Sequence, residues 1–172
     1  MTPEEILSHI RNVPDFPKEG ILFKDITTAL KKPQVLQAII DSLSELVKDI
    51  KIDYIAAIES RGFVIGAPLA YKIGAGLVII RKPGKLPAKV LHEEYSLEYG
   101  IDALEMHEDA IEKGKKVLIV DDILATGGTA AASLRLVEKA GGKVVGCLFL
   151  MELTALSQNV AISKPIYSLI KC

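Results

Sequence analysis

The sequence predicts an α/β fold with a central, mostly parallel five-stranded sheet flanked by helices. Helical patterns alternate with short, continuous apolar runs, as in parallel sheets that are covered on both faces. Polar, glycine-rich residues follow three of these runs, at the edge where such sheets bind ligands. The runs expected to form the strands are Tyr54–Ile58, Leu77–Ile80, Val117–Val120, Val144–Leu150 and Ile166–Ile170.

The first 32 residues or so are expected to form a small segment beside the sheet. Thr2–Glu5 has the capping-box pattern that begins a helix, which we expect to continue to about Arg11. Residues 12–20 contain prolines and a glycine, which indicate a loop. The apolar stretch Ile21–Lys24 predicts a short strand or an extended lid.

Three further helices are predicted between the strands. The first begins at Pro33 and is amphipathic, the second covers residues 63–72, and the third runs from about Thr129 to Ala140 and ends at a Gly-Gly pair. No repeat or linker divides the chain, so all 172 residues are expected to form one domain. The apolar face of the first helix is formed by Val35, Leu36, Ile39, Ile40, Leu43 and Leu46.

The composition argues against several classes of protein. A hydrophobic fraction of 49 % is typical of a globular chain, and a net charge of −1 lacks the basic excess of nucleic-acid-binding proteins. Cys147 and Cys172 are the only cysteines, too few for a disulfide framework or a zinc site. No apolar run reaches the roughly 18 residues of a membrane span, and the N-terminus has no signal core. We therefore expect a cytoplasmic protein with neither nucleic-acid nor membrane partners.

The run VLIVDDILATGGT, residues 117–129, is the most informative stretch of the sequence. An apolar strand leads to Asp121 and Asp122, and a loop of small residues then enters a helix. Glycines let the backbone approach a ligand, and loop N–H groups at a helix N-terminus attract an anion. A phosphate is therefore expected at Ala125, Thr126, Gly127, Gly128 and Thr129.

Two other phosphate-binding motifs do not fit the sequence. The loop lacks the Gly-x-x-x-x-Gly-Lys-Ser/Thr spacing of a nucleotide P-loop. The segment Gly74–Gly76 precedes a strand instead of following one, so it is no dinucleotide fingerprint. The structural alternative is an ordinary turn capped by the aspartates and bent by the glycines. The length of the pattern disfavours that alternative.

The run VLIVDDILATGGT resembles the motif with which type I phosphoribosyltransferases bind phosphoribosyl pyrophosphate (PRPP). More narrowly, the chain resembles the adenine phosphoribosyltransferases almost end to end, with Lys24 standing where arginine is common. The resemblance implies the type I core with an N-terminal hood over the base, and purine salvage that makes AMP and pyrophosphate from adenine and PRPP. The other matching stretches are FPKEGILFKDIT (16–27), IESRGFVIGAPLA (58–70), RKPGKLP (81–87), EEYSLEYGIDALEMHEDAI (93–111) and MELTAL (151–156).

The resemblance assigns roles to the residues of the motif. Asp121 and Asp122 are expected to hydrogen-bond the ribose hydroxyls, and residues 125–129 to surround the 5′-phosphate. Arg61 is expected to contact pyrophosphate from a turn in which family members often have a strained peptide. Mg²⁺ is the expected cofactor, held mainly by PRPP and water, so no metal ligands are predicted in the protein.

Four cations lie within nine residues, with no acid between them: Arg81, Lys82, Lys85 and Lys89. Such a cluster alone indicates a solvated loop as readily as a binding site. Its place after a predicted strand favours anion binding. By resemblance, Arg81 and Lys85 are expected to contact phosphate, either in their own subunit or in the partner's site of a homodimer.

Residues 93–112 contain eight acids and no lysine or arginine, and most of them are expected to be solvated. Within this segment, Glu98 and Tyr99 match the mobile catalytic loop of the family. We expect Glu98 to donate or accept the proton of the purine ring, with Arg61 as the second catalytic residue and Tyr99 among the PRPP-binding residues. Without the match, any one of these acids would be assigned to the surface.

Adenine must be distinguished from other purines by its exocyclic amine. A backbone carbonyl that accepts from this amine, and an N–H that donates to the adjacent ring nitrogen, would reject a 6-oxo group because polar groups would stay unpaired. By resemblance, these contacts come from the main chain around Leu22 and Lys24, with Phe23 packing on the base and Leu153 closing the other face. Without the match, Phe23 would be assigned to ordinary packing.

Two rival functions remain for testing. A phosphoribosyltransferase for xanthine or hypoxanthine is disfavoured by the stretches GILFKDI and EYSLEYG. A PRPP-sensing DNA-binding regulator is disfavoured because neither a helix-turn-helix-sized addition nor a basic tail is evident. The histidines at positions 9, 92 and 107 are too dispersed to predict a metal site.

Overall fold

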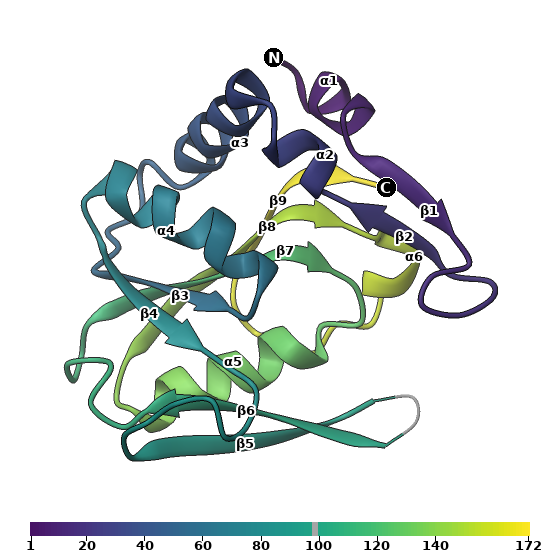
Figure 1. Cartoon of the computed structure of the whole chain (residues 1–172). Coiled ribbons are helices and arrows are strands. Elements are labelled where there is room, and N and C mark those ends of the chain that lie inside the picture. Colours follow the sequence, from purple (N-terminus) through teal and green to yellow (C-terminus); the bar gives the residue numbers. More distant parts are fainter. Residues whose placement is uncertain (98–99) are drawn as a thin grey trace.

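The computed structural model describes residues 1–97 and 100–172. Its centre is a five-stranded sheet in which each neighbouring pair is parallel, in the order β4-β3-β7-β8-β9 (Figure 1). This arrangement confirms the predicted fold class. The strands are β3 (Tyr54–Ile58), β4 (Gly76–Ile80), β7 (Lys116–Leu124), β8 (Lys143–Glu152) and β9 (Ile166–Lys171).

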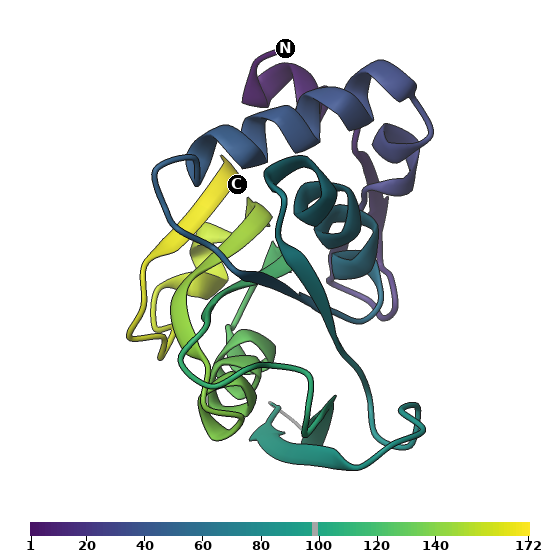
Figure 2. The ribbon, with the colours of Figure 1, turned by 90° about the vertical axis from the view of Figure 1, so that its left-hand side faces the viewer.

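Helices cover both faces of the sheet. One face carries α3 (Pro33–Leu46) and α4 (Arg61–Ile73), and the opposite face carries α5 (Gly128–Lys139), as Figure 2 shows. Successive residues of β3 alternate between the two cores: Ile55 packs with α3 and α4, and Ala56 with α5. Burial on both faces explains why the strands are continuous apolar runs in the sequence.

An antiparallel ribbon lies on the α5 side of the sheet. It consists of β5 (Val90–Ser96) and β6 (Ile101–His107), in which Tyr95 pairs with Asp102. Its apolar side chains, Leu104 among them, join the core formed around α5. The sequence interpretation, which assigned most of this acidic segment to solvated surface, did not predict the ribbon.

The N-terminal segment differs in part from the prediction. The first helix, α1 (Pro3–Ser8), ends before the expected Arg11, which begins the strand β1 (Arg11–Pro14). The loop predicted for residues 12–20 therefore begins only after Pro14. The reason is non-local: β1 pairs with β2 (Leu22–Asp25), and Arg11 Nη2 lies 2.5 Å from Asp25 Oδ2. The stretch 21–24, expected to be a short strand or an extended lid, forms the strand β2.

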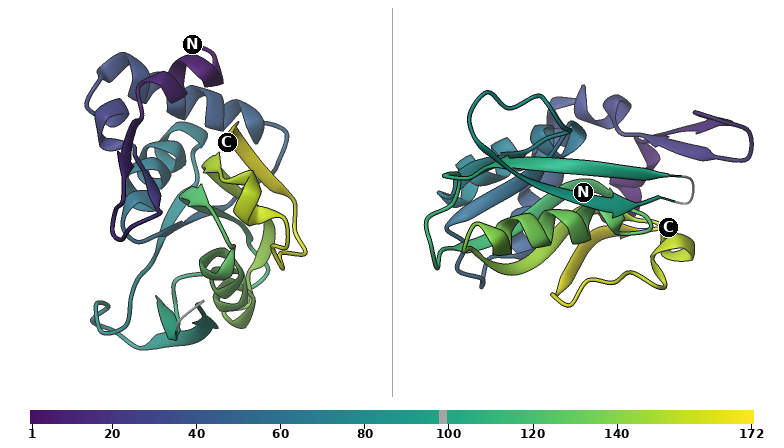
Figure 3. Two further views of the ribbon diagram at one scale, coloured as in Figure 1. Left: turned by 90° about the vertical axis from the view of Figure 1, so that its right-hand side faces the viewer. Right: turned by 90° about the horizontal axis from the view of Figure 1, so that it is seen from below.

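Two short helices complete the fold. The helix α2 (Thr27–Leu30) follows β2, and α6 (Thr154–Ser157) follows β8; neither was predicted. Figure 3 shows that the β1–β2 hairpin and α6 extend from the same side of the molecule. Within the part of the chain that the structure describes, no helix is both long and apolar enough to cross a membrane.

The strand β7 is longer than its apolar run. The sequence interpretation ended this strand at the two aspartates, but pairing with β8 continues to Leu124, which lies opposite Glu152. Asp121 and Asp122 therefore belong to the strand itself, and their backbone is held by the sheet. A strand residue presents its side chain in a fixed direction, so the two carboxylates are positioned by the core of the molecule.

Candidate active site

A cavity of about 260 Å³ opens where β3 and β7 end, at the carboxyl edge of the sheet. A smaller one of about 90 Å³ adjoins it, shares Asp121 and Thr129 with it, and is lined by the loop residues 125–127. The predicted carboxylates, Arg61 and phosphate-binding loop therefore come together in space. The larger cavity is lined by Glu59, Ser60, Arg61, Lys82, Leu104, Asp121, Asp122 and Thr129.

Gly127 and Gly128 shape the loop that precedes α5. Gly127 has φ +81°, a conformation that other residues adopt at a cost, and a Cβ there would lie 2.6 Å from Val160. A Cβ on Gly128 would lie 3.1 Å from the ring of Tyr95. The loop thus enters a twelve-residue helix whose free N–H groups favour an anion.

The two aspartates lie in different surroundings. Asp122 is 3 % exposed and accepts a hydrogen bond from Nε of Arg61. Asp121 Oδ1 accepts from the backbone N–H of Asp122 at 2.8 Å. Burial, and then the charge of Asp122, raise the pKa of Asp121 well above its usual range. The pair therefore offers one carboxylate that Arg61 holds and one whose charged form is disfavoured by burial.

Arg61 also joins the N-terminal hairpin to the site. Its guanidinium carbon lies 5.0 Å from the centroid of the half-buried Phe23 ring, a cation–π contact. On the hairpin, Phe16 meets Phe23 edge-to-face, with ring centroids 5.1 Å apart. The Glu59–Ser60 peptide just before Arg61 is cis, in the turn where the family resemblance led us to expect an unusual peptide.

The other expected base contacts lie on the same hairpin and at the end of β8. Leu22 is exposed, and Lys24 Nζ donates to Asn12 Oδ1 at 2.9 Å. Leu153 is partly buried, and its N–H donates to the carbonyl of Leu124 at 2.9 Å, which ties it to the strand below the phosphate loop. Their roles toward a base stay predictions.

Glu59 organises the basic loop that follows β4. Its Oε2 accepts from Arg81 Nε at 3.1 Å and from the backbone N–H of Lys82 at 2.9 Å, and its Oε1 accepts from Lys85. Burial raises the pKa of Glu59, but the hydrogen bonds from Lys85, from the backbone of Lys82 and from Arg81 outweigh it, so the pKa lies below its usual value. Arg81 and Lys85 are thus held at the margin of the site.

Four residues of the cavity wall were not assigned to the site from the sequence, namely Glu59, Ser60, Lys82 and Leu104. Lys82 lines the cavity, although the resemblance pointed to Arg81 and Lys85 instead. A signal was present in the sequence, because Glu59 directly precedes Ser60-Arg61 at a strand end and Lys82 stands in the basic run. What the sequence could not show was the ion pairing that decides which cation faces the cavity.

Glu98 and Tyr99, the residues expected in the catalytic loop, lie outside the described residues. On either side of them, the N–H of Leu97 donates to the carbonyl of Gly100 at 2.9 Å. Their expected roles stay predictions.

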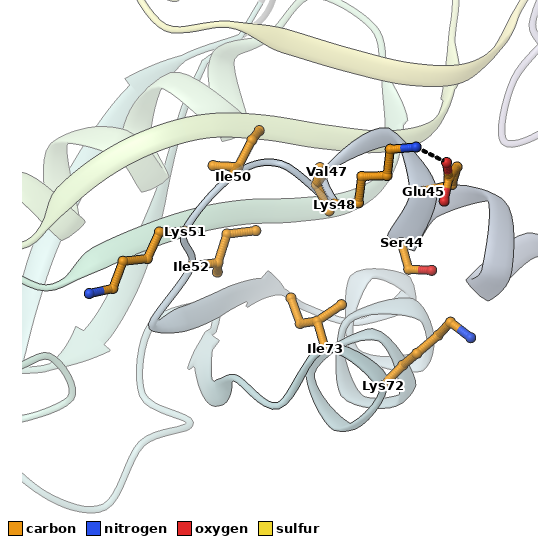
Figure 4. Close-up of a pocket in the computed structure, with 9 residues that line it drawn as sticks. All are labelled: Ser44, Glu45, Val47, Lys48, Ile50, Lys51, Ile52, Lys72 and Ile73. Carbon is orange, nitrogen blue, oxygen red and sulfur yellow. Dashed lines mark hydrogen bonds and ion pairs between the residues drawn. The ribbon is translucent and has the colours of Figure 1, made fainter.

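A cavity of about 470 Å³ lies away from this site, at the C-terminal ends of α3 and α4 (Figure 4). Lysines stand on its rim, but Lys48 pairs with Glu45, and Lys72 Nζ lies 2.9 Å from Asp41. Cations near helix C-termini stabilise the helix dipole. Lys48 and Lys72 therefore have a structural explanation, and the cavity shares no lining residue with the candidate active site.

The fold and the site define a class of protein. The family model for the phosphoribosyl transferase domain matches residues 26–172. An adenine phosphoribosyltransferase from a Thermotoga species is 58 % identical over 147 residues, which are 86 % of each chain. The chain therefore belongs to the phosphoribosyltransferase family and, within it, to the adenine phosphoribosyltransferases.

Two solved structures of adenine phosphoribosyltransferases agree with this assignment. The enzyme from Thermoanaerobacter pseudethanolicus superposes with a TM-score of 0.97 at 53 % identity, covering 99 % of this chain and 100 % of that one. The enzyme from Saccharomyces cerevisiae, solved with adenine and an imino-altritol bisphosphate, gives a TM-score of 0.91 at 41 % identity, with 97 % of each chain covered.

Proposed function

We propose that the chain transfers the 5-phosphoribosyl group of PRPP to adenine, giving AMP and pyrophosphate. The proposal rests mainly on one observation. Two carboxylates, a loop whose conformation depends on glycines, and several cations lie together around two adjoining cavities at the carboxyl edge of the sheet. PRPP presents hydroxyls, a 5′-phosphate and a pyrophosphate, and these cavities offer a partner to each of these groups.

Each wall of the cavity binds one part of PRPP. The loop 125–129 holds the 5′-phosphate, and the carboxylates of Asp121 and Asp122 hydrogen-bond the ribose hydroxyls. Arg61 and Lys82 bind the pyrophosphate and stabilise the negative charge that it gains as it leaves the anomeric carbon. Contacts far from the reacting carbon fix the sugar in place, which converts binding energy into positioning.

Arg81 and Lys85 are the two cations that Glu59 holds, and they reinforce the anion site from its margin. Glu98 supplies or removes the proton that adenine exchanges during the reaction. By resemblance to the family, the loop around Glu98 closes over the site and excludes water, whose attack on PRPP would waste the substrate.

The N-terminal residues, about 1–32, form the hood that selects the base. The base packs against Phe23, and the main chain around Leu22 and Lys24 recognises the exocyclic amine of adenine. Leu153 covers the opposite face of the base. The whole chain acts as one domain, and the cytoplasm remains its expected compartment.

Mg²⁺ accompanies PRPP in this proposal. Among residues 1–97 and 100–172, no group of three or more His, Cys, Asp or Glu side chains forms a metal cage. An ion that takes few protein ligands needs no such cage and is held mainly by PRPP and water. When bound, the ion neutralises part of the pyrophosphate charge, while Asp121 and Asp122 hydrogen-bond the ribose.

The chain assembles as a homodimer. Large apolar side chains are exposed along α4 and the edge strand β4, which are adjacent: Val64, Leu77, Ile79 and Tyr71, the last 92 % exposed. Contiguous exposed apolar surface indicates a protein interface. Because Arg81 directly follows β4, a partner bound along this strand would also lie close to the basic loop.

A panel of bases tests the proposed activity. Purified protein is incubated with PRPP, Mg²⁺ and adenine, hypoxanthine, guanine or xanthine in turn, and nucleotides are separated by chromatography. AMP from adenine, with little product from the 6-oxo purines, is the expected result. Faster conversion of a 6-oxo purine would show that this base, and not adenine, is the preferred substrate. PRPP binding without any product would favour a sensor instead of an enzyme.

A further inference from the structure

Lys82 is the lysine of the basic loop that lines the cavity, and its side chain is held by the β5–β6 ribbon. The ammonium donates to Oδ2 of Asp102 and, at 3.0 Å, to the hydroxyl of Tyr95. The Tyr95 hydroxyl in turn donates to the same Oδ2 at 3.0 Å. The three groups thus form a closed triangle of hydrogen bonds around the amine.

The two ribbon residues are themselves rigidly placed. Tyr95 and Asp102 are direct cross-strand partners, and Oδ1 of Asp102 accepts from the N–H of Ala103 at 2.8 Å. Tyr95 is 8 % exposed. Burial lowers the pKa of Lys82, but the hydrogen bonds that its ammonium donates to Asp102 and Tyr95 raise the pKa by more, so the lysine stays protonated while it is held.

The same tyrosine touches the phosphate loop. Its ring lies so close to Gly128 that a Cβ there would be 3.1 Å from Cδ2, and its hydroxyl is 3.5 Å from Oγ1 of Thr129. The Lys82 amine lies 5.5 Å from the centre of the Tyr95 ring. The Tyr95 side chain therefore contacts both Lys82 and the first residues of α5.

We propose that Asp102 and Tyr95 are positioning residues, which hold the Lys82 ammonium at the cavity wall for the pyrophosphate of PRPP and tie the β5–β6 ribbon to the phosphate loop. The inference rests on the proposed function. A free lysine loses considerable side-chain entropy when it binds a phosphate, and a lysine already fixed by two partners loses less. Asp102 thus assists anion binding although it carries a negative charge.

The role of Asp102 depends on Lys82, and this dependence gives the test. With Lys82 present, the carboxylate orients a cation. Without the lysine, an unpaired carboxylate would face the anionic substrate and repel it. A residue that merely stabilises the ribbon would have the same effect with or without Lys82.

The experiment is a pair of double-mutant cycles. Tyr95→Phe and Asp102→Asn are each made with Lys82 present and in the Lys82→Met background, and the Kd of Mg²⁺–PRPP is measured by calorimetry without adenine. Tyr95→Phe keeps the ring on Gly128 and removes only the hydroxyl. Tyr167→Phe, on the distant β9, is the matched control and leaves the Kd unchanged.

With Lys82 present, Tyr95→Phe and Asp102→Asn each weaken PRPP binding by about three- to tenfold, the range expected from the net contribution of one typical hydrogen bond. In the Lys82→Met background, Tyr95→Phe changes the Kd less than about twofold and Asp102→Asn tightens binding. The KM for adenine stays constant. Thermal unfolding of every variant confirms that the fold is retained.

Equal effects in both backgrounds, or tighter binding from Asp102→Asn with Lys82 present, overturn the inference. These outcomes differ from a failure of the proposed function. In that case the unaltered protein makes no AMP in the base panel, whereas the calorimetric cycles need no turnover.

Discussion

At the scale of the residue, Glu59 shows how one buried carboxylate sets the arrangement of several cations. Its side chain is 10 % exposed and joins the turn after β3 to the loop after β4 through Arg81, Lys85 and a backbone N–H. A group whose pKa is depressed by folding stabilises the folded state above its ordinary pKa. That stabilisation is lost as the pH falls through the depressed value.

Glu59→Gln is therefore expected to lower stability in a pH-dependent way. At pH 7 the loss of charged hydrogen bonds costs about 1–2 kcal/mol in the free energy of unfolding. The difference between the two proteins shrinks below about pH 4.3, the ordinary pKa of glutamate, because Glu59 itself becomes protonated. Urea unfolding between pH 3 and 7 measures it, and a difference that does not change with pH would contradict the role given to Glu59.

The contiguous part of the site could be predicted from the sequence. Asp121, Asp122 and the loop that follows them stand in one run, so their chemistry and spacing are visible without a fold. The choice among the cations could not be predicted. It depends on Glu59 from another strand and on Asp102 from the ribbon, and contacts between segments far apart in sequence leave no local pattern.

At the scale of the element, α4 packs unusually close to β3. A Cβ added to Gly66 would lie 2.6 Å from Cβ of Ala57, closer than real side chains approach. The small residues let the helix lie directly on the strand, and the helix begins at Arg61. The close packing of α4 on β3 therefore sets the position of Arg61 in the candidate active site.

Gly66→Ala is expected to destabilise the protein by about 1–3 kcal/mol through overpacking. Alanine favours helices over glycine by about 1 kcal/mol, so helix propensity alone predicts the opposite sign. Thermal or urea unfolding decides between them, with Gln37→Ala on the exposed face of α3 as a control that shifts stability by less than about 0.5 kcal/mol. A stabilised Gly66→Ala protein would refute the close packing.

The elements differ in how well the sequence predicts them. The five sheet strands are visible because burial on both faces makes each an apolar run. The ribbon β5–β6 buries only one side and carries many acids, so its alternating pattern was hidden among charges. The strand β1 arises from pairing with β2, and no periodicity within four residues marks such a strand.

At the scale of the whole molecule, the exposed apolar face of α4 and β4 predicts the dimer interface. The unaltered protein is expected to have twice the monomer mass in size-exclusion chromatography with light scattering. Tyr71→Glu places a charge at the most exposed of these side chains, and loss of an aromatic anchor costs about 2 kcal/mol or more. It is expected to raise the dimer dissociation constant by at least about tenfold.

Leu46→Glu serves as the control because it adds the same charge outside the α4–β4 surface: Leu46, expected on the apolar face of its helix, is in fact 40 % exposed on α3. It is expected to leave the mass unchanged. If Tyr71→Glu remains fully dimeric while Leu46→Glu dissociates, the interface lies on the other helix.

The ion pairs around the cavity affect which anions the protein can bind. Arg61 is paired with Asp122, Lys82 with Asp102, and both Arg81 and Lys85 with Glu59. An inorganic phosphate that enters meets cations whose charge is already partly balanced, and it contacts only one wall of the cavity. A ligand that brings both hydroxyls and several phosphates contacts the carboxylates and the cations together. We therefore expect these pairs to weaken the binding of small anions more than that of a ligand with both kinds of group.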